Sequence, residues 1–216
     1  MLEQDTFALT DPQELRSLIR GHGWAILITA ADDGPVVSHL PVLLDRDGSG
    51  GDTSDDAGGM PALVGHLARA DAELHRLGER KVTVVIQGPH GYVSPSMYEA
   101  TPYVPTWNYV VAHLHGQPDI LDADATYDVL RRTVDHFETA RPEPWRLDSV
   151  TPYAQSIAAH TTGFRLTPTR VVAKHKLSQD KPHDVAARVA DALAGDDPHR
   201  NPELAHAMRK VQVPRD

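Results

Sequence analysis

The chain contains no cysteine at all. Disulfide bonds, iron–sulfur clusters, thiolate-ligated haem and covalently attached c-type haem all require cysteine, so each of them is excluded. A haem group in this chain would therefore need histidine, tyrosine or methionine as its axial ligand. Positive charge is also scarce, because 21 lysines and arginines stand against 30 acidic residues for a net charge of −9. Nucleic-acid binding depends on basic side chains that displace counterions, so the charge argues against a nucleic-acid partner.

Long apolar runs are missing as well. No window approaches the roughly 18 apolar residues of a membrane span. The N-terminal residues do not combine a basic region with an apolar stretch, as a secretory signal does. We therefore expect a cytoplasmic protein with no membrane partner. A glycine-rich phosphate loop after a strand is also missing, which argues against a Rossmann nucleotide-binding fold.

The pattern of apolar residues predicts a fold that mixes strands and helices. Asp11 followed by Pro12 is typical of a helix start, and the Asp32-Asp33-Gly34 turn predicts a hairpin between two strands. We predict strands over 24–30, 35–44, 62–67, 81–87, 107–115, 163–169 and 171–177, helices over 12–21, 68–78, 122–140, 182–193 and 202–211, and a mobile loop over 45–60. Short local connections between the strands favour an α+β fold with a mainly antiparallel barrel and flanking helices.

Residues 88–116 are unusually rich in histidine, tyrosine and proline. Pro89, Pro95, Pro102 and Pro105 each fix φ and lack an N–H, so we expect a rigid, ordered loop up to about residue 106. From there the pattern has period two. Alternation places five residues on one strand face, namely Trp107, Tyr109, Val111, His113 and His115. We interpret this stretch as part of a binding site.

Five ordered motifs resemble the PaiB family, known as FMN-binding negative transcriptional regulators with a split-barrel fold. They are SHLP (38–41), GHLARA (65–70), GPH through YVSP (88–95), PTWNY (105–109) and KLSQ (176–179). The resemblance covers roughly residues 5–195. It implies a split-barrel domain over residues 1–195, with residues 196–216 as a C-terminal helical extension packed on the same domain.

Two further features are similar to a subgroup of that family, the piperazate synthases. These are the short segment SMYEATP (96–102), in which Met97 replaces a tryptophan, and the tail over 195–208. The resemblance implies an enzyme of natural product biosynthesis with haem b, which cyclises N5-hydroxy-L-ornithine to L-piperazic acid by forming an N–N bond. The alternative is an FMN-binding PaiB-like negative regulator or a flavin-dependent oxidoreductase.

The resemblance also implies candidate site residues. His66 is the predicted axial ligand of the haem iron and the metal-binding residue, although a lone histidine at a strand end also serves purely structural roles. Arg69, Lys176 and Ser178 are candidate anchors for FMN phosphate or haem propionates, whereas single surface cations are usually only solvated. Trp107 and Tyr109 are the remaining candidate cofactor contacts, with core packing as the alternative.

The acid and base of the predicted reaction are less constrained. His90, Tyr98 and Glu99 are the titratable groups nearest the predicted pocket loop and are our catalytic candidates. His113 and His115 share a strand face, but two histidines lack the third ligand of a zinc centre. Split-barrel relatives generally place cofactors at a subunit interface, so we also expect a homodimer.

Overall fold

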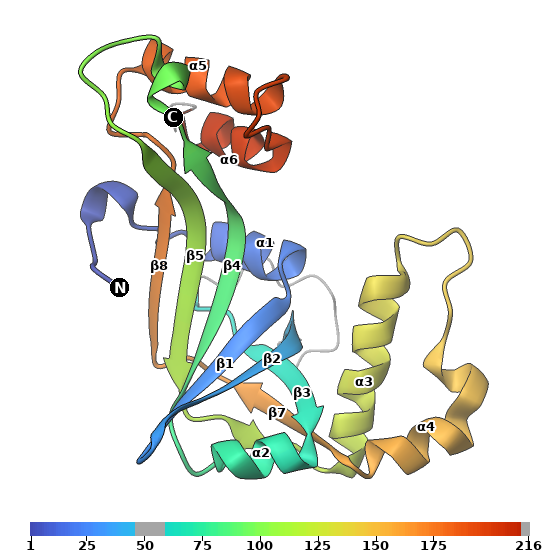
Figure 1. The fold of residues 1–216 in the computed structure, drawn as a ribbon. Coiled ribbons are helices and arrows are strands. Elements are labelled where there is room, and N and C mark those ends of the chain that lie inside the picture. The colour runs from blue at the N-terminus through green and yellow to red at the C-terminus, as the bar shows by residue number, and fades with distance from the viewer. Residues whose placement is uncertain (46–58, 213–216) are drawn as a thin grey trace. The chain divides into compact units, whose positions relative to one another are not determined.

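The computed structural model describes residues 1–45 and 59–212 (Figure 1). The predicted loop over 45–60 therefore lies almost entirely outside the described residues. The strands are β1 (Trp24–Ala31), β2 (Gly34–Leu44), β3 (Leu63–Ala68), β4 (Val82–Val93), β5 (Thr106–Gly116), β6 (Asp119–Ile120), β7 (Thr161–Leu166) and β8 (Arg170–Lys176). The helices are α1 (Pro12–Gly21), α2 (Arg69–His75), α3 (Ala123–Glu138), α4 (Thr151–Ala158), α5 (His183–Ala194) and α6 (Pro202–Gln212), with short 3-10 turns η1 (Asp5–Phe7), η2 (Pro95–Tyr98) and η3 (Leu147–Val150).

The eight strands form one sheet in the order β6-β7-β3-β2-β1-β4-β5-β8. The pairs β1–β2, β1–β4, β2–β3, β3–β7 and β6–β7 are all antiparallel. The predicted α+β class, a mainly antiparallel split barrel with flanking helices, is therefore confirmed. No helix within 1–45 and 59–212 is both long and apolar enough to cross a membrane.

Local sequence explains the first elements directly. The Asp11 carboxylate accepts a hydrogen bond of 2.8 Å from the backbone N–H of Gln13 and so caps α1. Every second residue near the start of β1 is buried, namely Ala25, Leu27 and Thr29. This period is typical of a strand with one face in the core. Gly34 closes the hairpin with a φ of +118°, a conformation that glycine adopts without strain.

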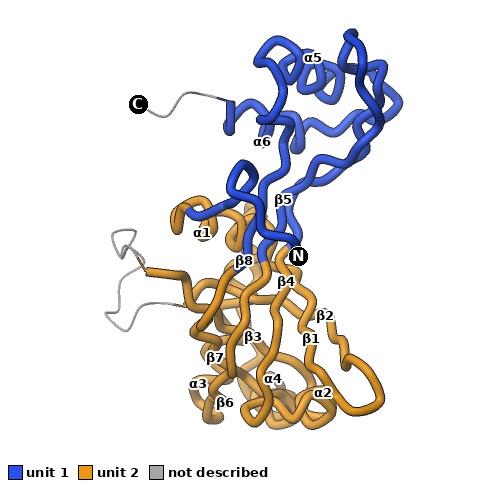
Figure 2. Tube along the Cα trace, turned by 90° about the vertical axis from the view of Figure 1, so that its left-hand side faces the viewer, with its two compact units in different colours: residues 1–10, 87–112, 172–216 blue, residues 11–86, 113–171 orange. Residues whose placement is uncertain are grey.

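The described residues fall into two compact units (Figure 2). Unit 1 comprises residues 1–10, 87–112 and 172–216, and unit 2 comprises residues 11–86 and 113–171. Strands β4, β5 and β8 each contribute residues to both units. The predicted division into a split-barrel domain over residues 1–195 and a C-terminal extension over residues 196–216 stays a prediction. Within unit 1, α6 packs against α5.

In unit 2, helix α3 covers β3 and β7 (Figure 1). Leu43, Val64 and Val129 form a buried cluster between strands and helix. A Cβ atom at Gly163 would lie 2.7 Å from Thr126 Oγ1, so the glycine allows the first turn of α3 to approach β7 closely. The Gly163 N–H in fact donates to that hydroxyl over 3.2 Å. The start of α3 is thereby fixed against the sheet.

Unit 1 is held together by a buried amide. Asn108 on β5 is 0% exposed, and its Nδ2 donates to Ser178 Oγ over 2.9 Å and approaches Met208 Sδ of α6 at 3.4 Å. Buried amides cost free energy when unpaired, so these contacts specify how β5, the segment after β8 and α6 meet. The asparagine of the PTWNY motif therefore has a structural task in this unit.

Two expectations about local structure were wrong. The predicted loop from residue 88 is instead a continuation of β4 as far as Val93, through Pro89. The β1–β4 ladder ends at the Ile26–Val85 pair, so Pro89 lies where β1 requires no N–H donor, and strands tolerate proline at such positions. Helix α4 was missed because it is short, mostly exposed and only weakly amphipathic.

Candidate functional site

His66 lies on β3 with a buried nitrogen that lacks a partner. It pairs with Gly163 of β7 in the strand register and is half-buried. Among the residues that the structure describes, no hydrogen-bond partner reaches its Nδ1. Burial lowers the pKa of His66 below its usual 6.5, because a low dielectric disfavours the charged imidazolium. At neutral pH the side chain is therefore a neutral imidazole, the form that ligates metals.

A cavity of about 740 Å³ in unit 2 is lined by residues of β7 that precede Gly163, the register partner of His66, whereas His66 itself is not one of its lining residues. Thr161 and Thr162, the residues just before Gly163, line it together with Arg69 at the start of α2. The remaining lining comes mainly from α3, α4 and the residues before α3: Ile120, Leu121, Ala123, Asp124, Thr126, Tyr127, Gln155, Ala158 and Ala159. Its size is in the range of sites for cofactors and drug-sized ligands.

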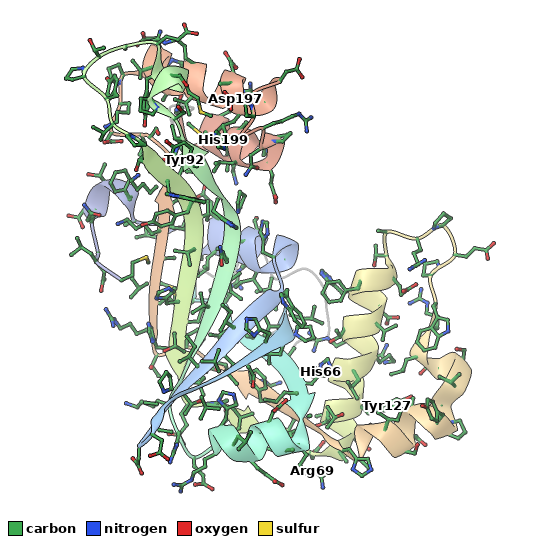
Figure 3. The ribbon with its side chains drawn as sticks, viewed as in Figure 1. His66, Arg69, Tyr92, Tyr127, Asp197 and His199 are labelled. Atoms are coloured by element: carbon green, nitrogen blue, oxygen red, sulfur yellow. The ribbon has the colours of Figure 1, made fainter. Side chains whose placement is uncertain are left out.

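Tyr127 lines this cavity and carries a buried polar atom without a partner. Its phenolic oxygen is buried and has no hydrogen-bond partner among the described residues. Figure 3 shows Tyr127 on α3 and His66 on β3, with Arg69 at the lower end of the same region. The Arg69 guanidinium donates to the carbonyl of Ala159, the residue after α4, and both residues line the cavity. We call His66, Arg69, Tyr127 and this cavity the β3–α3 site.

The chemistry of these side chains suits a haem group, with Arg69 and Tyr127 lining the cavity and His66 on the strand β3 that pairs with β7. Orphaned buried polar atoms are rare in folded proteins and call for an explanation, such as a bound group. A neutral histidine is a common axial ligand of haem iron, and an arginine pairs well with a propionate. A flavin would not use an imidazole as a ligand, but its phosphate could use the same arginine. His66 is thus the residue that distinguishes the two cofactors here.

Three rings of the 88–109 stretch, those of His90, Tyr92 and Trp107, lie together in unit 1. The rings of His90 and Trp107 stack with centroids 6.4 Å apart, and Tyr92 meets Trp107 edge-on at the same separation. Tyr92 also contacts His199 at 4.9 Å (Figure 3). Trp107 remains 55% exposed. The structure therefore brings His90 and Trp107 together, as two of the predicted site residues.

Two of the predicted anion anchors have protein partners in unit 1. Lys176 Nζ donates to Thr106 Oγ1 over 2.6 Å and to the Trp107 carbonyl over 2.8 Å. Ser178 is buried with a φ of +66°, and its hydroxyl exchanges hydrogen bonds with Asn108. Burial lowers the pKa of Lys176. Both side chains thus hold the KLSQ segment against β5.

The other predicted residues of unit 1 differ in exposure. Tyr98 is almost fully buried against Tyr103, with centroids 4.6 Å apart, and burial raises its pKa. Glu99 is exposed and takes a φ of +47° after η2. Tyr109 is half-buried on β5. An acid–base role for Tyr98 would require its phenol to become accessible to substrate, whereas Glu99 already faces solvent.

His39, His113 and His115 contact aromatic rings or a hydroxyl. The ring of His39 stacks on Trp24 at 6.5 Å, and His113 meets His115 edge-on at 6.3 Å. His115 Nδ1 is 2.9 Å from Thr83 Oγ1. Within 1–45 and 59–212, no three or more His, Asp or Glu side chains gather as a metal site.

The sequence pattern indicates neither Tyr127 as a functional candidate nor His75 as a structural one. Tyr127 falls in the apolar stripe of α3, and nothing in that stripe indicates that this residue lines a cavity. His75 is 0% exposed, with Nδ1 2.8 Å from Thr29 Oγ1 and Nε2 3.0 Å from Ser38 Oγ. It therefore ties α2 to the β1–β2 hairpin, a contact between distant segments that no local pattern predicts.

These buried histidines predict a stability that falls with acidification. Burial lowers the pKa values of His66, His75, His113 and His115 from 6.5. The unfolded chain then binds more protons than the folded chain below pH 6.5, so the free energy of unfolding decreases as pH falls through that window. Urea midpoints at pH 7.5 and at about pH 5.5 check this, the latter still above the range of most carboxylates. Equal midpoints would contradict the prediction.

Comparison with known proteins places the chain in a family. Residues 1–170 match the family model described as "Putative FMN-binding domain". The "Protease synthase and sporulation protein PAI 2" of Bacillus subtilis is 26% identical over 204 residues, covering 94% of this chain and 93% of that protein. The "FAD and Heme binding protein" of Mycobacterium smegmatis has a TM-score of 0.53 at 20% identity, covering 83% of this chain and 78% of that one.

A second solved structure has the same fold. The "Flavocytochrome Anf3" of Azotobacter vinelandii has a TM-score of 0.56 at 16% identity, covering 83% of this chain and 74% of that one. The motifs at residues 38–41, 65–70, 88–95 and 105–109 lie within the span that the family model matches. The chain therefore belongs to the PaiB-like family of FMN-binding split-barrel proteins.

Proposed function

We propose that the protein is a haem-dependent piperazate synthase, which forms the N–N bond of L-piperazic acid from N5-hydroxy-L-ornithine. The observation that carries the proposal is His66, a half-buried neutral imidazole whose Nδ1 is buried without a partner among the described residues. Its strand β3 pairs with β7, and Thr161 and Thr162 of β7 line the cavity of about 740 Å³. FMN binding, as in a PaiB-like regulator or a flavin-dependent oxidoreductase, is the alternative. It would leave the unpaired nitrogen of His66 unexplained.

Each residue of the β3–α3 site would contribute a different contact to haem b. His66 would hold the iron, because no cysteine exists in the chain and its imidazole is neutral at physiological pH. Arg69 would pair with a propionate while it keeps its bond to the Ala159 carbonyl, since a guanidinium has five N–H donors. Tyr127 would offer its phenol as a hydrogen-bond donor inside the cavity.

The reaction is balanced without an external oxidant or reductant. The α-amine nitrogen of the substrate forms a bond to N5, the N5–O bond breaks, and the departing hydroxide and one amine proton leave as water. Haem iron, when bound, supplies a Lewis acid that weakens the N–O bond. The protein must fold the substrate so that the two nitrogens meet, donate a proton to the departing oxygen and accept one from the amine. Tyr127 is the candidate donor that lines the cavity. The sequence-derived candidates His90, Tyr98 and Glu99 belong to unit 1 and do not line it.

Relatives support a haem-compatible fold. The Mycobacterium smegmatis structure is of a protein that binds FAD and haem, and Anf3 is a flavocytochrome. Both proteins share the split-barrel fold with this chain. The short SMYEATP segment at 96–102 further favours the piperazate synthase subgroup over flavin-binding members.

The proposal is tested by spectrum and turnover of the purified protein. A Soret band, together with conversion of N5-hydroxy-L-ornithine to piperazic acid with loss of one water, would support it. A flavin band near about 450 nm with no Soret band, even after reconstitution with haemin, would instead favour the alternative. Haem binding without turnover would support the proposed cofactor and contradict the proposed reaction.

We also propose that the protein is a homodimer. Trp24 and Val37 are 62% and 49% exposed on the β1–β2 hairpin of unit 2, and large exposed apolar side chains often mark an interface. Sedimentation of the cofactor-loaded protein at micromolar concentration should give twice the chain mass of 23.6 kDa. A monomer with full cofactor occupancy would rule the dimer out.

A further inference from the structure

A second cavity in unit 2, of about 440 Å³, has a lining unlike the rest of this acidic chain. It lies where β4 begins, β5 ends and β8 begins. Lys81, His115 and Arg170 supply its only titratable lining groups, and no carboxylate lines it among the residues that the structure describes. In a chain with 30 acidic and 21 basic residues, three basic groups around one cavity create a local positive potential.

Hydrogen bonds to side chains and to the backbone hold the polar groups of this cavity in place. Thr83 Oγ1 is 2.9 Å from His115 Nδ1 and so fixes the imidazole, which leaves Nε2 as the ring nitrogen for a ligand. The Thr169 N–H and hydroxyl donate to the His115 carbonyl over 2.8 and 3.3 Å. These bonds keep the start of β8, and hence Arg170, beside the end of β5.

The positive charge of Arg170 acts on His115 in this cavity. The positive charge of Arg170 adds to burial in lowering the pKa of His115, so the guanidinium lies close enough to oppose protonation of the imidazole. An anion between them would relieve that repulsion, because opposite charge favours the protonated form. Ile28, Pro35 and Val82 give the same cavity an apolar wall.

We propose that this cavity binds a small organic oxyanion, a phosphate monoester or a carboxylate. Lys81, Arg170 and His115 Nε2 would hold the anionic head, with the Thr83 and Thr169 hydroxyls nearby. The apolar body would lie on Ile28, Pro35 and Val82. Arginine provides forked, charge-assisted bonds to either head group and lysine a point charge. The volume exceeds that of an inorganic anion, which is why we assign an organic ligand.

The site is distinct from the β3–α3 site, because the two cavities share no lining residue. It therefore stands independently of the proposed haem chemistry. A ligand here would contact the beginning of β4 and the end of β5 in unit 2. Such a position suits a binding or regulatory role for a phosphorylated or carboxylated metabolite.

The test is calorimetric titration of the full-length protein, with its cofactor, using phenyl phosphate, benzoate, inorganic phosphate and phenol. We expect phenyl phosphate or benzoate to bind more tightly than inorganic phosphate, and phenol not to bind. Lys81→Gln and Arg170→Gln should each weaken binding roughly tenfold, because each removes a charge-assisted contact. Preference between phenyl phosphate and benzoate identifies the head group.

A control variant makes the test specific. Arg141→Gln removes an exposed cation of the same unit that pairs with Glu138 and should leave the affinity unchanged. If Lys81→Gln and Arg170→Gln bind the ligand as tightly as the wild type, or if phenol binds as tightly as phenyl phosphate, the assignment is wrong.

Discussion

Replacing His66 with alanine should abolish haem binding, or leave a haem with water as its ligand, and should eliminate turnover of N5-hydroxy-L-ornithine. The chain has no cysteine that could replace His66 as a ligand, and His66 carries the unpaired buried imidazole nitrogen of the β3–α3 site. Haem content per chain, Soret position and turnover measure the effect together. His66→Ala removes a half-buried side chain, so circular dichroism must first show that the variant folds.

Matched histidine variants provide the control. His39→Ala, His90→Ala, His113→Ala and His115→Ala should keep the wild-type Soret band, since the described contacts of these residues are rings, hydroxyls, an amide or a carbonyl. Turnover by His90→Ala could still fall if His90 positions the substrate. If one of these variants loses haem while His66→Ala keeps it, the ligand assignment is wrong.

Tyr127→Phe should keep haem and lower turnover if its phenol serves as a donor.

Replacing Gly65 with valine should destabilise the protein by about 2–3 kcal/mol, or lower its Tm by roughly 5–10 °C. A Cβ atom at Gly65 would lie 2.8 and 2.9 Å from ring carbons of Phe164 and 3.2 Å from the Pro41 carbonyl oxygen. Phe164 is 0% exposed, so its ring has no room to retreat. The strain would fall next to His66 and should weaken cofactor binding as well.

Two further variants test this explanation. Gly21→Val is the matched control, because a Cβ atom at Gly21 meets no atom within 4 Å, and its Tm should change little. In a Phe164→Leu background, the cost of Gly65→Val should shrink, since contacting residues couple energetically. A Gly65→Val protein that melts at the wild-type temperature would contradict the predicted overlap, and an unchanged cost in the Phe164→Leu background would assign the strain to the backbone.

The GHLARA motif illustrates how sequence and structure divide the explanation. Sequence resemblance indicated His66 as the ligand but gave no reason for its neighbours. In the structure Gly65 makes room for Phe164, Leu67 is buried in the core, and Arg69 begins α2 beside the cavity. One short motif therefore serves packing on one face of β3 and the proposed cofactor on the other, because alternate residues of a strand face opposite sides.

The sequence by itself determined the hairpin of β1 and β2, the capped start of α1, most strand and helix positions, and the α+β antiparallel class. These follow from local rules: side-chain period, capping residues and turn residues act within a few positions of one another. Composition alone also restricted any haem ligand to histidine, tyrosine or methionine. The family could be named from five short motifs before any strand was placed.

Only the tertiary structure decided which atoms are left without partners. Periodicity predicts the buried face of β3 and of α3, but not that Thr126 docks on Gly163, the register partner of His66, nor that Tyr127 lines a cavity in the same unit. Nor could it show that Lys81, His115 and Arg170, which lie up to 89 positions apart in the chain, border one cavity. Pairing of β3 with β7 joins segments about 100 residues apart, and such contacts depend on packing of the whole chain, which no local pattern encodes.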